Sequence, residues 1–176
     1  MVKIFLIIIS LLFNSQAFGQ KNETPQELGK IVFEALTKKD SALFEKAKTN
    51  EADLIFAIQR MMKKVDKEIE DEKIKETYTM YSTNFMLSFL ETIKQGENEG
   101  IEWSKITYSK TYFNERPDSD PEHIEIGRTY LEFKYQDKFY VIKIGDSIKI
   151  KGNWTIEDKI NWIGKRDKDD SWKSNN

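Results

Sequence analysis

Residues 127–162 read GRTYLEFKYQDKFYVIKIGDSIKIKGNWTIEDKINW, a stretch in which apolar and polar residues alternate. In a strand, Leu131, Phe133 and Tyr135 point to one face, whereas Glu132 and Lys134 point to the other. A period of two is typical of a half-buried strand. We therefore expect antiparallel strands that form a sheet with one dry face and one face in water.

Polar interruptions divide this stretch into strands. The sequences QDK at residues 136–138 and GDS at residues 145–147 each predict a reversal of the chain, and Gly152 with Asn153 predicts a third. Apolar positions resume after each of them and continue to Trp162.

A change of parity precedes the first of these strands. Ile124 and Ile126 have even numbers, whereas Leu131 and Phe133 have odd ones. One continuous strand needs an extra residue to turn all of them to the same face. Gly127 is therefore expected to form a β-bulge.

The N-terminus has the features of an export signal. Lys3 supplies a positive start, residues 4–13 are apolar apart from one serine, and residues 17–19 (AFG) form a small-x-small exit, so we expect cleavage of residues 1–19 before Gln20. The alternative is a membrane anchor, but this run is short beside the about 20 residues that a spanning helix needs. The chain is expected to be exported, to the periplasm or out of the cell, without a stable membrane span in its mature form.

Composition narrows the remaining possibilities. The chain has no cysteine, which excludes disulfides, thiolate metal sites and a lipid-modified cysteine. Charged residues make up 33% of the sequence with a formal net charge of -2, and the two signs are finely mixed, so no basic field for nucleic acid exists. We expect one domain over residues 20–164 and a polar tail over residues 165–176.

Helices are expected before the sheet. Thr24, Pro25 and Glu27 form a helix start with a capping box. The apolar residues that follow share one helical face: Leu28, Ile31, Val32, Ala35 and Leu36. Asp40 or Ser41 can begin a short second helix.

Residues 51–94 contain neither glycine nor proline, and one straight helix of that length would be about 66 Å long. We expect a break within the charged segment, near residues 70–73, and hence an antiparallel helix pair. A coiled-coil dimer is the alternative, but its heptad pattern is not sustained. Residues 95–100 (QGENEG) are expected to form the turn after the helices, with Gly96 as the C-cap.

A first strand is expected over residues 101–114, where mixed parity suggests a bulge or cover on both faces. Residues 115–123 (ERPDSDPEH) are expected to form an exposed loop. The tail carries one aromatic residue, Trp172, and is expected to be solvated.

Metal or catalytic chemistry has little support in the sequence. Asp118, Asp120, Glu122 and His123 are close in sequence, but they lack the spacing of a calcium loop, so a solvated acidic loop is the preferred interpretation. His123 is the only histidine and has no nucleophile motif beside it. The sequence contains no glycine-rich phosphate loop, and we expect no cofactor.

Aromatic residues are concentrated in the expected sheet. A curved sheet lined in this way can hold an apolar ligand, although an ordinary aromatic core under helices is the more common outcome. The residues are Tyr108, Tyr112, Tyr130, Phe133, Tyr135, Phe139, Tyr140, Trp154 and Trp162.

Three segments resemble parts of small exported proteins of Bacteroidetes-type bacteria: residues 100–106 (GIEWSKI), 138–144 (KFYVIKI) and 151–156 (KGNWTI). The N-terminal signal is similar too. Helices followed by an antiparallel sheet resemble the NTF2-like or cystatin-like α+β folds. Some NTF2-like enzymes use a pocket Asp with Tyr or His, but no position here matches such a motif, so the resemblance implies no catalytic residue.

We therefore predict an α+β fold, with about four helices on one face of a four- or five-stranded antiparallel sheet. The leading hypothesis for function is a non-enzymatic exported protein that binds a small apolar molecule or another protein. An NTF2-like pocket enzyme with carboxylate and tyrosine acid–base chemistry is the alternative, and an envelope-associated structural role is a third. A filled core with an exposed apolar patch favours the first, whereas a carboxylate and a tyrosine buried together at a pocket floor favour the second. No catalytic, cofactor-binding or metal-binding residue is assigned.

Overall fold

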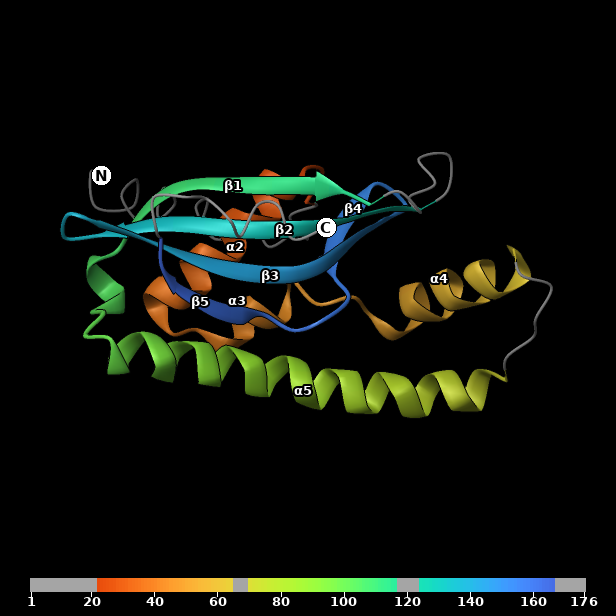
Figure 1. The fold of residues 1–176 in the computed structure, drawn as a ribbon. Helices are drawn as coiled ribbons and strands as arrows, with labels where there is room; N and C mark the ends of the chain where they lie inside the picture. Colours follow the sequence, from red (N-terminus) through yellow and green to blue (C-terminus); the bar gives the residue numbers. More distant parts are fainter. Residues whose placement is uncertain (1–21, 65–69, 117–123, 167–176) are drawn as a thin grey trace, which may run out of the picture.

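The computed structural model describes residues 22–64, 70–116 and 124–166, and it shows helices followed by an antiparallel sheet. The predicted α+β class is confirmed (Figure 1). The elements are α2 (Pro25–Lys38), α3 (Ser41–Glu45), α4 (Glu51–Lys64), α5 (Asp71–Asn98), the 3-10 helix η1 (Trp103–Lys105), β1 (Thr107–Glu115), β2 (Glu125–Tyr135), β3 (Lys138–Ile150), β4 (Asn153–Ile156) and β5 (Asn161–Lys165).

The sheet has the order β1-β2-β3-β4, and β5 also pairs with β3. β4 pairs with residues 147–150 of β3 and β5 with residues 140–143, and both run antiparallel to it. The two short strands therefore share one edge of β3 and are separated by residues 157–160. The sheet is four positions wide, and its fourth position is interrupted.

The predicted helix starts are confirmed. Thr24 Oγ accepts from the Glu27 N–H at 3.2 Å, and the Glu27 carboxylate accepts from the Thr24 N–H at 3.0 Å, so the capping box is complete. Asp40 caps α3 by accepting from the Leu43 N–H at 3.0 Å. These caps fix where α2 and α3 begin and therefore which of their faces meets the sheet.

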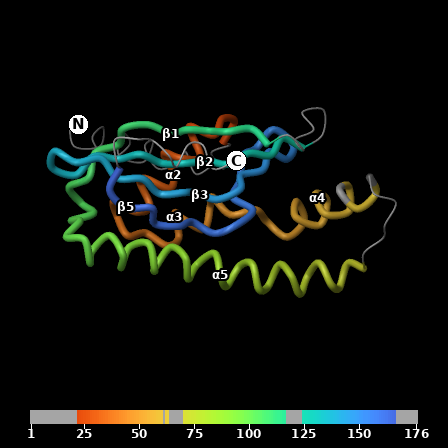
Figure 2. The backbone as a smooth tube through the Cα atoms, viewed as in Figure 1, coloured from red at the N-terminus to blue at the C-terminus, as the bar shows by residue number. Residues whose placement is uncertain are grey.

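The long helical segment is divided as predicted, since α4 ends at Lys64 and α5 begins at Asp71. α4 and the N-terminal part of α5 lie side by side past one end of the sheet, and the rest of α5 runs along the sheet (Figures 1 and 2). The prediction for the end of α5 was wrong, because the helix continues to Asn98 and Gly96 is buried within it. A Cβ on Gly96 would lie 2.3 Å from Cζ2 of Trp103, so the glycine serves close packing and does not cap the helix.

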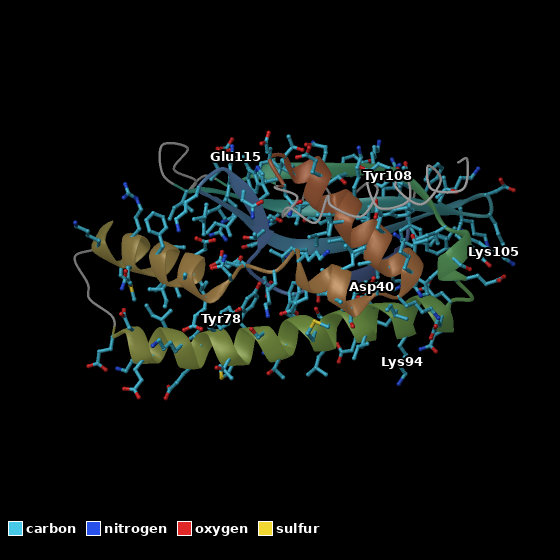
Figure 3. The ribbon with its side chains drawn as sticks, turned by 180° about the vertical axis from the view of Figure 1, so that it is seen from behind. Asp40, Tyr78, Lys94, Lys105, Tyr108 and Glu115 are labelled. Atoms are coloured by element: carbon cyan, nitrogen blue, oxygen red, sulfur yellow. The ribbon has the colours of Figure 1, made fainter. Side chains whose placement is uncertain are left out.

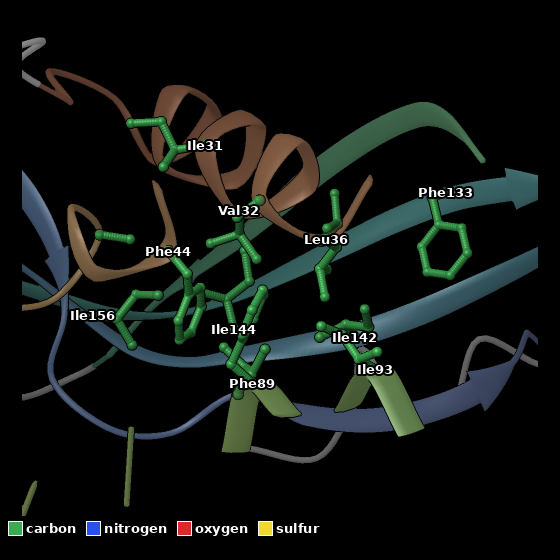
Figure 4. Close-up of a cluster of buried hydrophobic side chains, with 14 of the residues drawn as sticks. Ile31, Val32, Leu36, Phe44, Phe89, Ile93, Phe133, Ile142, Ile144 and Ile156 are labelled. Atoms are coloured by element: carbon green, nitrogen blue, oxygen red, sulfur yellow. The ribbon is translucent and has the colours of Figure 1, made fainter. Parts of the chain in front are cut away.

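The main core lies between the sheet and helices α2, α3 and α5. Figure 4 shows Val32 of α2, Phe44 of α3 and Phe89 of α5 around Ile144 of β3, and Leu36 of α2 over Ile142. Phe44 stacks on Phe89 with ring centroids 4.4 Å apart. The apolar face predicted for α2 is buried in full.

Two of the three predicted reversals are confirmed. Gln136, with φ 53°, lies in the tight β2–β3 turn, and Lys151 and Gly152, both with positive φ, form the β3–β4 turn. The reversal at Gly145 was wrong, because β3 continues through it to Ile150. Gly145 has a φ of +99°, and a Cβ there would lie 2.5 Å from the Lys159 carbonyl oxygen, so a glycine is needed where β3 passes residues 157–160.

The bulge predicted at Gly127 was also wrong. The irregularity between β2 and β3 lies at Thr129 and Tyr130, which pair with Gly145 and Lys143 and leave Ile144 as the extra residue on β3. A Cβ on Gly127 would lie 2.3 Å from the ring of Phe113, and this close contact accounts for the glycine. In β1 the predicted irregularity is confirmed between Tyr108 and Lys110, although the strand begins at Thr107 and Trp103 lies in η1 before it.

The change of parity between Ile126 and Leu131 is not caused by a bulge in β2. Ala57 of α4 packs with Ile124, Ile126, Ile148 and Ile150 in a second apolar cluster. These isoleucines alternate along their strands with positions of the other parity, so Ala57 packs on side chains that point away from the main core. The predicted packing of helices on the sheet is therefore met in the main core by α2, α3 and α5, whereas α4 contributes to the second cluster.

The other face of the sheet is not wholly in water either. Glu132, predicted to point into water, is 1% exposed, and Tyr130 and Val141 are buried as well. Among the described residues, no helix is long and apolar enough to cross a bilayer.

Candidate functional site

Glu132 is the buried acidic residue of the sheet, and three side chains bind it. Its Oε1 accepts from the Ser109 hydroxyl at 2.6 Å, and its Oε2 accepts from the Tyr112 hydroxyl at 3.2 Å and from the Arg166 guanidinium at 2.6 Å. A buried carboxylate needs this many partners because it has lost its water. Lys110 lies 4.4 Å from the centre of the Tyr112 ring, which adds a second positive charge nearby.

This cluster joins both edges of the sheet to its centre. Ser109 and Tyr112 belong to β1, Glu132 to β2, and Arg166 follows directly after β5. Both carboxylate oxygens are occupied by donors of the protein itself, and the Arg166 charge balances the carboxylate. The arrangement ties the end of β5 to the sheet and is structural.

Phe133, Tyr140 and Trp162, which were among the residues that could have lined an apolar ligand site, pack on one another and on Trp103. The Phe133 and Tyr140 rings stack with centroids 5.6 Å apart, and Trp103 lies 5.7 Å from Phe133. Trp162 lies 5.9 Å from both Tyr140 and Trp103. Phe133, Tyr140 and Trp103 are buried, so these rings form the aromatic core that was the more common alternative.

An open groove of about 560 Å³ lies between α5 and the connection from β4 to β5. We call it the α5 groove. Figure 1 shows β5 and the segment leading into it on the side of the sheet that faces α5. Residues 157–159 form one wall of the groove because the fourth strand is interrupted there and the chain bulges toward the helix.

Two polar side chains of α5 fix that wall. The Tyr81 hydroxyl donates to the Ile156 carbonyl and accepts from the Thr49 N–H at 3.2 Å. Two helical turns later, Ser88 Oγ accepts from the Ile160 N–H at 3.2 Å. The connection is thus held to α5 at both of its ends.

The floor between these anchors is aromatic. Phe85 is fully buried and lies 5.8 Å from the Tyr81 ring, measured between centroids. Burial raises the pKa of Tyr81 above its ordinary value of 10.0. The hydroxyl therefore stays protonated and serves as a hydrogen-bond donor.

The walls carry charge of mostly one sign. Glu91 on the helix side and Glu157 and Asp158 on the connection supply three carboxylates, and Lys159 supplies one ammonium group. Glu91, Asp158 and Lys159 are exposed at the rim. Among the described residues, neither Glu91 nor Asp158 forms an ion pair.

The helix wall of the groove continues into an exposed apolar ridge, which we define as Met80, Leu87 and Leu90. Their exposed fractions are 67%, 50% and 55%. Lys94 lies seven residues after Leu87, on the same helical face, and Figure 3 shows it pointing away from the body while Tyr78 points toward it. The ridge therefore occupies the outer face of α5, and Met80 and Leu87 also line the groove.

The sequence could have indicated this surface. Residues 77–90 contain no charged residue in a chain that is 33% charged. Half of this run faces water, so burial does not account for its composition. Phe85 and Phe89 of the same segment are buried, so one buried helix face is enough to explain apolar residues there, and the exposed ridge was not predicted.

The acidic residues considered for a metal site lie outside the described residues, as do His123, Trp172 and residues 1–19. Within the described ranges, no group of three or more acidic, histidine or cysteine side chains is placed to hold a metal ion.

Comparison with known proteins gave no relative. No protein-family model, curated protein or solved structure matches the chain.

Proposed function

We propose that the protein is an exported, non-enzymatic binding module that holds a protein partner on α5, over the apolar ridge and the adjacent α5 groove. The observation that carries the proposal is the ridge itself. Met80, Leu87 and Leu90 are each at least half exposed on one face of one helix. Exposed apolar side chains that share one helical face and have a polar rim are typical of interaction surfaces.

The position of the ridge favours a protein over a small apolar ligand. It lies on the outer, convex face of a helix and extends past the groove to Leu90, which does not line it. A small apolar molecule gains most from an enclosed site. A partner that lays a segment along α5 covers the ridge and the groove together.

The contacts in the groove do not favour the enzyme alternative. Tyr81, the tyrosine at its floor, is occupied by a backbone carbonyl and held protonated by burial. The buried carboxylate Glu132 is paired with Arg166 elsewhere in the sheet. An acid–base pair needs a carboxylate and a second titratable group that meet at one reacting atom.

Export and fold family complete the proposal. The signal-like residues 1–19 support export with cleavage before Gln20. A meander in the order β1-β2-β3-β4 with α2 packed across it supports a distant NTF2-like or cystatin-like layout. Fold alone does not set the function, so the binding role rests on the ridge.

Site-specific photo-crosslinking in the cells that produce the protein tests the proposal. A benzophenone amino acid replaces Thr83, which is exposed on α5 between Met80 and Leu87. We expect a discrete protein adduct after irradiation, which mass spectrometry identifies. The same group in place of Lys30, exposed on α2, is expected to give no such adduct.

Matched variants show whether the adduct depends on the ridge. Leu87→Asn together with Leu90→Asn is expected to abolish it, because both changes place amide groups in the apolar contact. Phe139→Asn, which alters an exposed apolar residue away from α5, leaves it unchanged. An adduct that survives the ridge substitutions, or no adduct at position 83, would overturn the proposal.

A further inference from the structure

We propose that the partner segment held in the α5 groove is cationic and amphipathic, with lysine or arginine side chains between the two walls and apolar side chains on the ridge. This inference rests on the proposed binding function and names the chemical class of its partner.

The groove is lined by more acidic than basic groups. Three of its four ionisable lining groups other than Tyr81 are carboxylates. Carboxylates that face one gap repel one another, and a cation between them turns that repulsion into attraction. An anionic segment would be repelled by the three carboxylates and attracted only by Lys159 among the lining residues.

The two walls of the groove each supply a carboxylate. Glu91 lies on α5, whereas Asp158 lies on the β4–β5 connection, so each wall of the groove has a carboxylate. Tyr81 and Ser88 hold the connection to the helix at residues 156 and 160. The two carboxylates therefore belong to walls that are fixed relative to each other, which lowers the entropic cost of binding a cation between them.

The apolar ridge lies directly beside the acidic groove. Met80 and Leu87 line the groove and are also exposed on the ridge. A partner segment that extends from the carboxylates of the groove therefore meets apolar surface next. Lysine and arginine fit such a boundary because their alkyl stems cover apolar atoms while their charged ends stay polar. Leucine-like neighbours of the basic residues would contact Leu87 and Leu90.

Fluorescence anisotropy with two labelled peptides tests this. The probes are LKKLLKKLLKKL and LEELLEELLEEL, which share their apolar pattern and differ in the sign of their charges. We expect the lysine peptide to bind the purified protein at least about tenfold more tightly than the glutamate peptide. The difference is expected to shrink as ionic strength rises from about 0.05 M to about 0.5 M.

Charge-neutralising variants locate the effect. Glu91→Gln with Asp158→Asn is expected to weaken binding of the lysine peptide about fivefold, the scale of two exposed ion pairs. The matched control is Glu72→Gln with Glu76→Gln, which removes the same charge from exposed positions of α5 outside the groove and leaves binding unchanged. Circular dichroism confirms that all variants stay folded.

The outcomes separate this inference from the proposed function. If both pairs of substitutions weaken binding equally, the attraction is general and the groove is not its site. If both peptides bind alike, or neither binds, the cationic class is wrong. In each of these cases the crosslink at position 83 still decides the binding function, because that readout does not depend on the charge of the partner.

Discussion

Replacement of Gly96 by alanine tests how α5 is seated on the sheet. In an ordinary helix, Gly→Ala adds about 1 kcal/mol of stability. Here the added methyl group would lie 2.3 Å from Cζ2 of Trp103. We therefore expect the opposite sign.

The magnitude follows from the surroundings of the Trp103 ring. It is 1% exposed, donates from Nε1 to the Ile93 carbonyl at 3.1 Å and packs on Phe133 and Trp162, so it cannot turn away freely. Overpacking at such a site costs about 3 kcal/mol, the upper part of the usual range. The net loss for Gly96→Ala is about 2 kcal/mol, or about 4–8 °C in Tm for a chain of this size.

Thermal and urea unfolding followed by far-ultraviolet circular dichroism measure this loss. Repeating the change in a Trp103→Phe background removes the ring atoms that clash, so Gly96→Ala should there stabilise the chain by up to about 1 kcal/mol. The two backgrounds then differ by about 3 kcal/mol in the effect of the same substitution. A Gly96→Ala chain that melts higher than the wild type would refute the packing of α5 on Trp103.

Three further predictions concern other parts of the chain. Protein recovered from the producing cells should begin at Gln20 by intact-mass measurement, and an intact N-terminus would contradict export by cleavage. Glu132→Gln should lower the free energy of urea unfolding by about 1–2 kcal/mol, because Arg166 loses its ion pair in a largely buried site; a change within error would show that the pair adds nothing. Burial raises the pKa of Tyr81, so the unfolded chain ionises this group first, and stability should fall as pH rises above about 10. The fall should be smaller in Tyr81→Phe, and equal slopes in the two chains would contradict the assignment.

Local signals in the sequence were enough for the helix starts. Thr24 and Glu27 are three residues apart and make their capping contacts within a single turn. The charged segment between α4 and α5 likewise predicted a break in the helix. Each of these features depends on residues close together in sequence, which is why they could be predicted.

Features that depend on distant residues were not predictable in this way. The sequence around Gly145 is typical of a turn, but the glycine is needed because the Lys159 carbonyl lies beside it. The sequence around Gly96 is typical of a helix cap, but the glycine is needed because Trp103 packs against it. Glu132 falls on the polar side of an alternating strand, yet Arg166, far along the chain, brings a charge to it. A period of two tells which face a residue points to and says nothing about what covers that face.

The α5 groove has the same origin. Residues 157–159 could be seen as polar positions between Ile156 and Ile160, but only the pairing of β4 and β5 with the same edge of β3 makes them a wall against α5. The uncharged run over residues 77–90 was the one local signal of the ridge.

The interrupted fourth strand also bears on how copies of this chain behave when crowded. A long, straight outer strand offers free amide and carbonyl groups on which another molecule can add, and fibres grow from such templates. Here β4 is short, and its outer side is already occupied, since Ile156 bonds to Ala47 and Thr49 and the Trp154 N–H donates to the Asn22 carbonyl. The outer side of β4 is thus closed to a second chain, and the interruption at residues 157–160, which forms a wall of the groove, keeps this edge of the sheet from continuing as one long strand.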